Sequence, residues 1–352
     1  LPYISEKDRN DLTWAFQNGC DMVACSFVSK VKDIEEIKAL RDACKSKARI
    51  IAKIENGAGI KNLKSILDAC DGVMVARGDL GVEIPFVEVP SIQKYLIKKC
   101  RLLGKRVITA TEMLESMINN PRPTRAEISD VANAVYDGTS AIMLSGETAT
   151  GKYPVLTVQT MSRIAESTEK CINYPKRFAN SEFKIRNTVD ALSHATCGMA
   201  IDINAKAIVA CSLSGMTARM VSRFRAPVDI IGLTTDEATW RRLSLSWGVT
   251  PAMCEKFTST DVLFYCATQL AKEKFGLQAG DKIVITGPSV PAAIRWLINT
   301  VFMSVGAMLI TCLTAAMAGY VLAKKRFIGQ GIVFSLIVCA MALPKQVILI
   351  PL

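Results

Sequence analysis

Two short apolar runs, separated by the length of one helix, constrain the fold of this chain most strongly. Residues 49–55 and 72–76 are rich in Ile and Val, and charged side chains occur only towards their ends. Such a pair predicts neighbouring buried parallel strands in a β-α-β unit. Lys53 and Glu55 are two residues apart and project from one face of the first run, whereas Asp79 follows the second run.

The carboxylates at these two strand ends are candidate ligands for a divalent cation. Adjacent strands lie about 4.8 Å apart, so Glu55 and Asp79 could each supply oxygen to one Mg²⁺ ion. The alternative is that Lys53 and Glu55 form the solvated face of an edge strand. The apolar setting and the glycine at Gly78 favour a site, because a buried charge is costly without a partner.

The same alternation of strand and helix extends on both sides of this unit. No Gly-x-Gly-x-x-Gly motif opens any of the helices, which favours an α/β fold of the (β/α)8 TIM-barrel type over a doubly wound sheet. Five β/α units are too few to close an eight-stranded barrel, so residues 1–172 predict an incomplete one. We expect strands at 21–27, 49–55, 72–76, 106–110 and 140–144, helices at 33–44, 60–69, 88–103, 124–136 and 153–172, and a first helix at 5–18.

Polar side chains follow the carboxyl ends of all five expected strands. In barrels this rim carries the chemistry, whereas the opposite rim carries stability. Chance would place one or two polar residues there, and six on one rim predict an active site. These residues are Ser26, Lys53, Glu55, Asp79, Thr111 and Ser145.

A second, smaller α/β domain is expected at 187–288, after a polar linker at 173–186. Its expected strands are 207–212, 228–234, 248–253 and 281–286, and its helices are 188–204, 216–224, 236–245 and 259–275. The first strand leads into a turn of small residues that opens a helix, where backbone N–H groups and hydroxyls can bind phosphate. An ordinary helix-capping turn is an equally good interpretation. The residues concerned are Ser212, Ser214, Gly215 and Thr217.

The composition of the chain indicates which kinds of partner and which cellular compartment to expect. The net charge of +11 is spread along the chain and forms no basic stripe with aromatics, so we expect no nucleic-acid partner. Twelve cysteines occur without a Cys-x-x-Cys pair, which argues against a zinc ribbon and favours a reduced, cytoplasmic location. The single histidine, His194, lies in a helical pattern and is expected to have a helix-surface or packing role rather than to catalyse or to bind a metal.

The last part of the chain, 289–352, has a different composition. Residues 298–323 form a run of 26 residues without a charge, which is long enough to cross a membrane. A basic cluster follows at 324–326, and 331–344 begins a second apolar segment that is interrupted at Pro344. We expect one or two transmembrane helices here, with a buried core helix as the alternative for each.

The first half of the chain contains six distinctive blocks, which are Ile-Ile-Ala-Lys-Ile-Glu-Asn (50–56), Val-Met-Val-Ala-Arg-Gly-Asp-Leu-Gly (73–81), Thr-Ala-Thr-Glu-Met-Leu-Glu-Ser-Met (109–117), Asn-Pro-Arg-Pro-Thr-Arg-Ala-Glu (120–127), Asp-Val-Ala-Asn-Ala-Val-Tyr-Asp-Gly (130–138) and Ile-Met-Leu-Ser-Gly-Glu-Thr-Ala (142–149). Together and in this order they closely resemble the blocks of the pyruvate kinase family, and the resemblance covers residues 1–288. One departure is Ala58, where the family usually has an acidic or amide residue.

The resemblance implies transfer of a phosphoryl group from phosphoenolpyruvate to ADP in glycolysis, giving pyruvate and ATP, with Mg²⁺ and K⁺. Glu55 and Asp79 would hold Mg²⁺, and Lys53 would contact the transferring phosphate. Backbone N–H groups at Gly78 and Asp79, together with Thr111, would bind the substrate carboxylate. The resemblance also implies that Thr111 and Ser145 help to orient the proton source, that 212–217 binds the phosphate of a sugar-phosphate or nucleotide effector, and that the protein is a homotetramer.

In the family, three further strands with a catalytic arginine and the K⁺ ligands, and an inserted lid domain, come before the position of Leu1. We therefore expect this chain to have negligible kinase activity. The tail from 295 to 352 resembles a permease subunit of bacterial carbohydrate ABC transporters, through the segments 295–302, 318–327 and 344–352. That resemblance implies insertion in the bacterial inner membrane. The missing front strands and the abrupt change of composition near residue 289 lead us to expect a fusion of two gene fragments. The alternative functions are an effector-phosphate module at 187–288 and a fragment of a transport permease.

Overall fold

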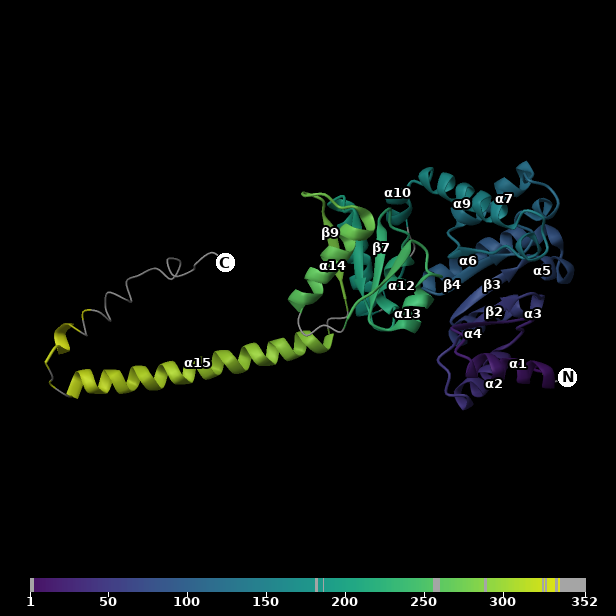
Figure 1. Cartoon of the computed structure of the whole chain (residues 1–352). Helices are drawn as coiled ribbons and strands as arrows, with labels where there is room; N and C mark the ends of the chain where they lie inside the picture. The colour runs from purple at the N-terminus through teal and green to yellow at the C-terminus, as the bar shows by residue number, and fades with distance from the viewer. Residues whose placement is uncertain are drawn as a thin grey trace. The chain divides into compact units, whose positions relative to one another are not determined.

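The computed structural model describes residues 3–180, 183–185, 187–255, 260–287, 290–324, 326, 328–332 and 335. The chain forms two compact units, 1–288 and 289–352 (Figure 1). The first unit contains both sheets, and the second contains the long apolar helix.

Five parallel strands form the first sheet in the order of the sequence, β1-β2-β3-β4-β5. This sequential order is that of a β/α barrel, whereas a doubly wound sheet reverses its order. All five expected strands are present, although β5 has only two residues where the sequence predicted 140–144. Their bounds are β1 Met22–Cys25, β2 Arg49–Ile54, β3 Gly72–Ala76, β4 Arg106–Ala110 and β5 Ala141–Ile142.

The helices between these strands begin and end at recognisable capping residues. Ser5 and Thr124 each form a capping box with the acidic residue three positions later, and Gly104 and Gly138 end helices in the left-handed conformation. The elements are α1 Glu6–Gln17, α2 Val31–Ala43, α3 Gly57–Lys61, α4 Leu63–Ala69, α5 Arg77–Glu83, η1 Phe86–Glu88, α6 Val89–Leu103, η2 Glu115–Ile118, α7 Arg125–Asp137, α8 Gly146–Ala149 and α9 Pro154–Lys170.

Two expectations for these helices were wrong in detail. The helix expected at 60–69 is divided at Asn62 into α3 and α4. The short elements α5, η2 and α8, which follow the strand ends, were not expected, because four to seven residues are too few to show helical periodicity.

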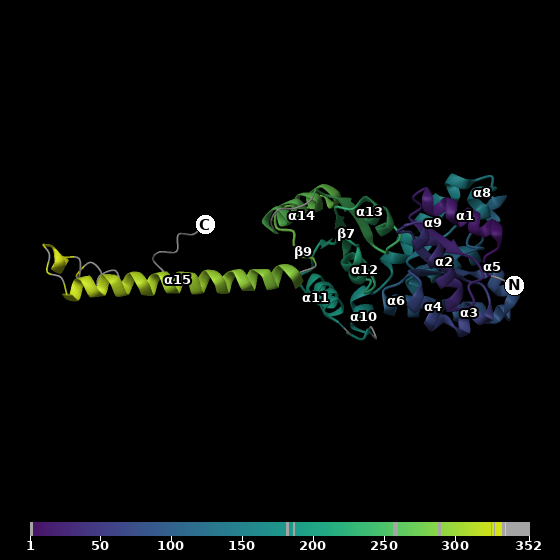
Figure 2. The same ribbon diagram turned by 90° about the horizontal axis from the view of Figure 1, so that it is seen from below.

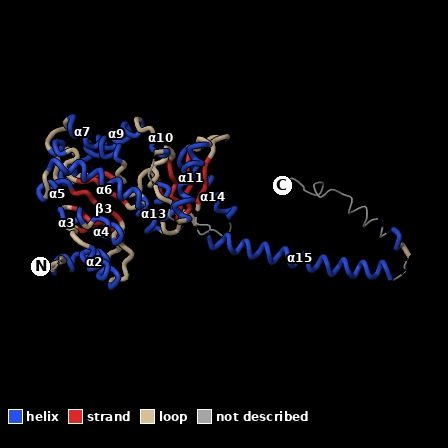
Figure 3. Tube along the Cα trace, turned by 180° about the vertical axis from the view of Figure 1, so that it is seen from behind, coloured by secondary structure: helices blue, strands red, loops and turns tan. Residues whose placement is uncertain are grey.

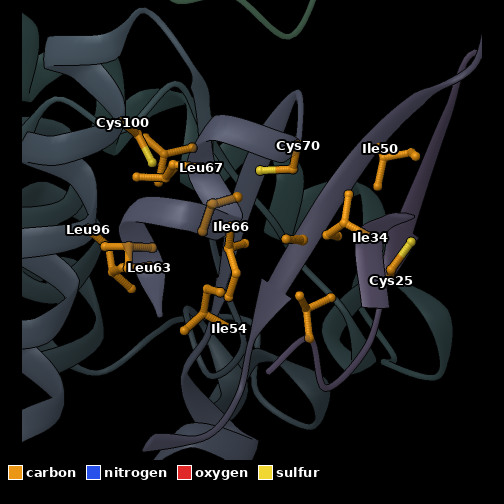
Figure 4. Packing of buried hydrophobic residues seen from close by; sticks show 14 of the residues in the cluster. Cys25, Ile34, Ile50, Ile54, Leu63, Ile66, Leu67, Cys70, Leu96 and Cys100 are labelled. Atoms are coloured by element: carbon orange, nitrogen blue, oxygen red, sulfur yellow. The ribbon is translucent and has the colours of Figure 1, made fainter. Parts of the chain in front are cut away.

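Both faces of the first sheet are apolar, as expected for parallel strands. On the face covered by helices, Ile50 and Ile54 of β2 belong to the same buried cluster as Ile66 of α4 and Leu96 of α6 (Figure 4). Residues at alternate positions lie on the opposite face, where Ile51, Met74 and Ile108 form a smaller cluster. Lys53 is two residues after Ile51 and so belongs to this second face.

The second sheet has four parallel strands in the order β8-β7-β6-β9. β6 is therefore flanked by β7 on one side and β9 on the other, which is the reversal typical of a doubly wound sheet. All four expected strands are confirmed, with helices on both faces (Figure 2). The bounds are β6 Ala207–Cys211, β7 Asp229–Thr234, β8 Val249–Met253, β9 Ile283–Thr286, α11 Thr188–Asp202, α12 Met216–Ser222, α13 Glu237–Leu243 and α14 Thr260–Phe275.

The stretch expected to be a linker, 173–186, contains the helix α10, Tyr174–Ala179. Phe178 of this helix stacks on His194 at 5.0 Å between ring centroids, and both rings contact Phe224. His194 therefore packs in an aromatic cluster, as predicted. The two α/β parts of this unit are also joined by a hydrogen bond. Arg225 Nη2, after α12, donates to the carbonyl of Gly138, after α7, at 2.9 Å.

The second unit contains α15, Val290–Lys324 (Figure 3). Within the described residues, one helical segment, Thr300–Lys324, is long and apolar enough to cross a membrane. Its length of 25 residues corresponds to about 37 Å, against a hydrocarbon core of about 30 Å. Large apolar side chains such as Phe302, Ile310 and Leu313 are exposed along it. The second expected span, 331–344, lies mostly outside the described residues.

Candidate active site

Lys53 and Glu55 form a close ion pair at the carboxyl end of β2. The Lys53 Nζ atom lies 2.7 Å from Glu55 Oε1, and the Glu55 side chain is completely buried. Lys53 Nζ also donates a hydrogen bond of 2.8 Å to Ser26 Oγ, which follows β1. The structure therefore brings together Ser26, Lys53 and Glu55, three of the six polar residues that the sequence placed on this rim.

The turn after β1 supplies a hydrogen bond to the buried Glu55 carboxylate. The backbone N–H of Phe27 donates to Glu55 Oε2. Phe27 has φ of +52°, a left-handed conformation that is uncommon for a bulky residue and is concentrated at functional sites. The hydroxyl of Tyr3 donates to the Ser26 carbonyl, and burial raises the pKa of Tyr3 above its usual value. The Glu55 carboxylate is thus bonded both by the turn after β1, through Phe27, and by Lys53 of β2.

A second strained turn follows β4. Thr111 has φ of +73° and Glu112 has φ of +54°, and a positive φ is a genuine outlier for a β-branched residue. The guanidinium of Arg77 holds this turn, since its Nη2 donates to the Thr111 carbonyl at 2.6 Å and to the Glu112 carbonyl at 3.0 Å. Arg77 is itself ion-paired with Asp130 of α7.

Gly78 lies directly against Thr111. A Cβ atom at position 78 would come within 2.9 Å of Thr111 Cγ2, so a side chain there would displace the threonine. The structure therefore brings together two of the predicted substrate-binding residues, one after β3 and one after β4. The backbone around Gly78 can be approached closely only because this residue has no side chain.

Asp79, which the sequence placed after the second run, is in the first turn of α5 and is exposed to solvent. No group of three or more His, Cys, Asp or Glu side chains that could hold a metal occurs in the described part of the chain. Mg²⁺ is usually bound through one or two carboxylates together with water and substrate oxygens. Two carboxylates from neighbouring strand ends, one of them buried and aligned by a backbone N–H, fit that pattern.

Glu147 is a site residue that the sequence did not single out. This buried carboxylate accepts the backbone N–H of Leu114 at 3.1 Å and that of Ser145 at 2.8 Å. It therefore links the turn after β4 to the segment after β5, and it positions Ser145 at the start of α8. Burial raises the pKa of nearby Glu115, and the charges of Glu147 and Glu112 add to that shift.

The predicted effector turn follows β6 and leads into α12. Gly215 caps the helix at φ of +71°, and a Cβ atom there would meet Leu243 and Thr239 at 3.1 Å. Ser214 is exposed, whereas Ser212 and Thr217 are buried. This turn is at the carboxyl end of β6, where the strand order reverses, and in open α/β sheets ligands bind at that point.

Five parallel β/α units in sequential order, with a lysine–carboxylate pair at the carboxyl end of a strand, are typical of the β/α-barrel class of proteins. Residues 1–158 match the family model described as pyruvate kinase, barrel domain, and residues 190–293 match pyruvate kinase, alpha/beta domain. The two α/β parts of the chain therefore belong to the barrel-domain and alpha/beta-domain families of pyruvate kinase.

Individual relatives agree with this assignment. The chain is 47% identical over 287 residues to a pyruvate kinase of Clostridium acetobutylicum, covering 81% of this chain and 61% of the relative. It is 48% identical over 295 residues to one of Bacillus licheniformis, covering 83% of this chain and 50% of the relative. The crystal structure of a pyruvate kinase from Cryptosporidium parvum superposes with a TM-score of 0.79 at 39% identity, over 81% of this chain and 60% of that one. The chain thus spans between half and about three-fifths of the length of these relatives.

Proposed function

We propose that residues 1–288 carry the phosphoryl-transfer site of a pyruvate kinase, which transfers phosphate from phosphoenolpyruvate to ADP to give pyruvate and ATP. The observation that supports this most is the buried Glu55 carboxylate, ion-paired to Lys53 and aligned by the Phe27 N–H. A buried charge held this precisely fits electrostatic catalysis, in which the protein positions groups and neutralises moving charge.

Each residue has a role that its chemistry supports. Lys53 would offer a compact cation to the transferring phosphate and to the developing enolate oxygen. Glu55 and Asp79 would hold Mg²⁺, which when bound supplies Lewis-acid neutralisation of the substrate oxygens. The N–H groups around Gly78 and Asp79 would bind the substrate carboxylate. K⁺ is part of the proposal through the family, without ligands assigned in this chain.

Protonation of the enolate to pyruvate would involve the second strained turn. Thr111 would bind the substrate carboxylate and orient the proton source, and Ser145 would take part in the same relay. Arg77 and Glu147 would be positioning residues, because they hold the backbone of the turns that carry Thr111 and Ser145.

We expect the turnover of this chain by itself to be negligible. In the described residues β1 and β5 are the edges of the first sheet, so the site is open beside β1, and open sites exclude water poorly. An assay of pyruvate formation should give a rate below about a thousandth of a usual kinase kcat of about 1–100 s⁻¹. A rate within that usual range would contradict this expectation.

Binding tests the proposed site independently of turnover. Phosphoenolpyruvate with Mg²⁺ should raise the Tm of the chain by about 3 °C at saturating concentration. Lys53→Met should abolish the shift because it removes the cation that faces the phosphate. Lys7→Met, on the exposed surface of α1, is the matched control and should retain the shift. An unchanged shift in Lys53→Met would contradict the proposed role.

A second candidate function is the binding of a sugar-phosphate or nucleotide effector by residues 187–288. It is supported by the turn at 212–217, with its left-handed Gly215 at the switch point of the second sheet. Ser214→Ala should weaken a thermal shift produced by fructose 1,6-bisphosphate and leave that produced by phosphoenolpyruvate unchanged. Equal sensitivity of both shifts would argue against two separate sites. The homotetramer expected of the family is part of the same proposal.

For the tail, we propose insertion of α15 in the bacterial inner membrane, with the kinase-like residues in the cytoplasm. The exposed apolar segment Thr300–Lys324 supports insertion, and the resemblance to an ABC-transporter permease supports a fusion of two gene fragments. Removing residues 290–352 should shift the expressed protein from the membrane fraction to the soluble fraction. A soluble full-length chain would contradict insertion, and a membrane-bound truncated chain would place the anchor elsewhere.

A further inference from the structure

A small cavity between the first and second sheets of unit 1–288 is lined by six cationic side chains and by no carboxylate. Its walls come from the end of α6, the start of β4 and the turn between them, from Ser140 before β5, from α12 and the residues after it, and from Ser246 after α13. The cationic residues are Arg101, Lys105, Arg106, Arg219, Arg223 and Arg225.

Several hydrogen-bond donors around this cavity have no acceptor within the described residues. They include the Nε atoms of Arg101, Arg106, Arg219 and Arg225. Arg106 is only 6% exposed and Arg225 only 3% exposed, so these donors are not satisfied by bulk solvent. A buried donor without a partner costs free energy, and more so when it belongs to a charged group.

Two carboxylates close to the cluster already have ion-pair partners. Asp71 is ion-paired with Arg49 at 3.1 Å, and Asp190 is ion-paired at 2.8 Å with Arg223, one of the six cationic residues of the cavity. Burial lowers the pKa of Arg106 to about 10, and the neighbouring charge of Arg219 adds to that effect. The cluster therefore carries excess positive charge, which a neutral water molecule cannot compensate.

We propose that this cavity is a binding site for a monatomic anion of the chloride class. The cavity volume is about 10 Å³, which corresponds to one water-sized group and excludes phosphate and sulfate. An anion there would accept hydrogen bonds from arginines on both sides and would join the two parts of the unit. It would connect α12, which follows the turn at 212–217, to β4, which ends directly before Thr111.

Thermal unfolding of the full chain in non-ionic detergent tests the site. Sodium chloride should raise the Tm by about 3 °C relative to sodium gluconate at equal ionic strength, because gluconate is too large for the cavity. Arg219→Met should lose this difference, since it removes one of the unpartnered donors and keeps an apolar stem. Arg9→Met, whose side chain is half exposed on α1, changes the net charge equally and should keep it.

Two results would overturn the proposal: equal Tm values of the wild-type chain in the two salts, or the same chloride response in both variants. If Arg219→Met does not fold, a crystal structure of the wild-type protein grown in sodium bromide tests the site. Anomalous density from bromide between the guanidinium groups of Arg106 and Arg219 would support the site, and its absence would overturn it. Because phosphoenolpyruvate is not involved, failure here leaves the proposed catalytic function untouched.

Discussion

Gly78 and Thr111 show at the scale of single residues how the site restricts the sequence. Gly78 is next to a threonine that has φ of +73° and whose carbonyl accepts a hydrogen bond from Arg77, so a side chain at position 78 would displace Thr111. The sequence indicated both residues, because they directly follow strands. It could not show their contact, which depends on how two turns from different strands pack.

We expect Gly78→Ala to destabilise the chain by about 1–3 kcal/mol, since the new methyl group would overlap Thr111 Cγ2. Gly57→Ala is the matched control: a Cβ atom there meets only Ile84, at 3.8 Å, and alanine favours the helix. Urea denaturation would measure both changes. Adding Thr111→Ser to Gly78→Ala removes Cγ2 and should recover most of the loss; no recovery would exclude steric overlap as the cause.

The sequence did not point to Glu147, because its role depends on the backbone N–H groups that it accepts in the folded chain. An acidic residue after Ser-Gly in a short turn looks like a solvated loop, and the two N–H groups that it accepts come from separate segments. Its burial, with 1% exposure, is visible only in the folded chain. By contrast, Lys53 and Glu55 could be predicted, because their spacing on one strand determines their common face.

Replacing Glu147 with glutamine should cost about 1–3 kcal/mol, because one buried N–H would then face an amide NH₂ group in place of a carboxylate oxygen. The matched control is Glu83→Gln on the exposed side of α5, for which we expect a change within about 0.5 kcal/mol. The denaturant midpoints of the two variants, compared with that of the wild type, would measure these changes in stability. Equal, small changes in both variants would show that Glu147 does not hold the two turns together.

At the scale of elements, the start of α7 is stabilised by one carboxylate. Glu127 accepts hydrogen bonds from the backbone N–H and hydroxyl of Ser116 and from those of Thr124. Burial alone would raise the pKa of Glu127, but these bonds outweigh it and lower the pKa below the usual 4.5. Thr124 and Glu127 have the spacing of a capping box, which is a local feature of the sequence, whereas the bond to Ser116 of η2 depends on the folded chain.

Glu127→Ala should therefore destabilise the chain by about 1–2 kcal/mol at neutral pH. Because the folded pKa is the lower one, the stabilisation is present above about pH 4.5 and is lost as the pH falls through the folded value. The difference between wild type and variant should thus shrink in acid. Glu35→Ala, on the exposed side of α2, serves as control. A difference that does not depend on pH would show that the carboxylate charge is not responsible.

The strands were predicted better than the short helices for a physical reason. Buried parallel strands require long runs of Ile and Val, as in β2, β3 and β6, and such runs are visible in the sequence. β5 is shorter than the expected 140–144, and the segment beyond it leads into α8, where Glu147 accepts the Ser145 N–H. Likewise α10 is stabilised by aromatic contacts of Phe178 with distant rings, which local composition does not reveal.

For the whole molecule, the order of strands distinguishes its two α/β parts. The first sheet keeps the sequential order of a barrel, and the second reverses at β6. The barrel order was predicted from the sequence, whereas the reversal in the second sheet depends on where β9 joins, which no local pattern specifies. The long apolar α15 forms a separate unit, in agreement with the change of composition near residue 289.

Binding of Mn²⁺, measured by the loss of its free electron-paramagnetic-resonance signal, tests the proposed site most directly. The wild-type chain should bind Mn²⁺ more tightly when phosphoenolpyruvate is present, because Glu55 and Asp79 provide only part of the coordination and the substrate provides more. Glu55→Gln should weaken that binding by at least about tenfold, or about 1.4 kcal/mol, while Glu6→Gln on α1 should not. Equal affinity in the wild type and in Glu55→Gln would contradict a metal and phosphate site at the end of β2.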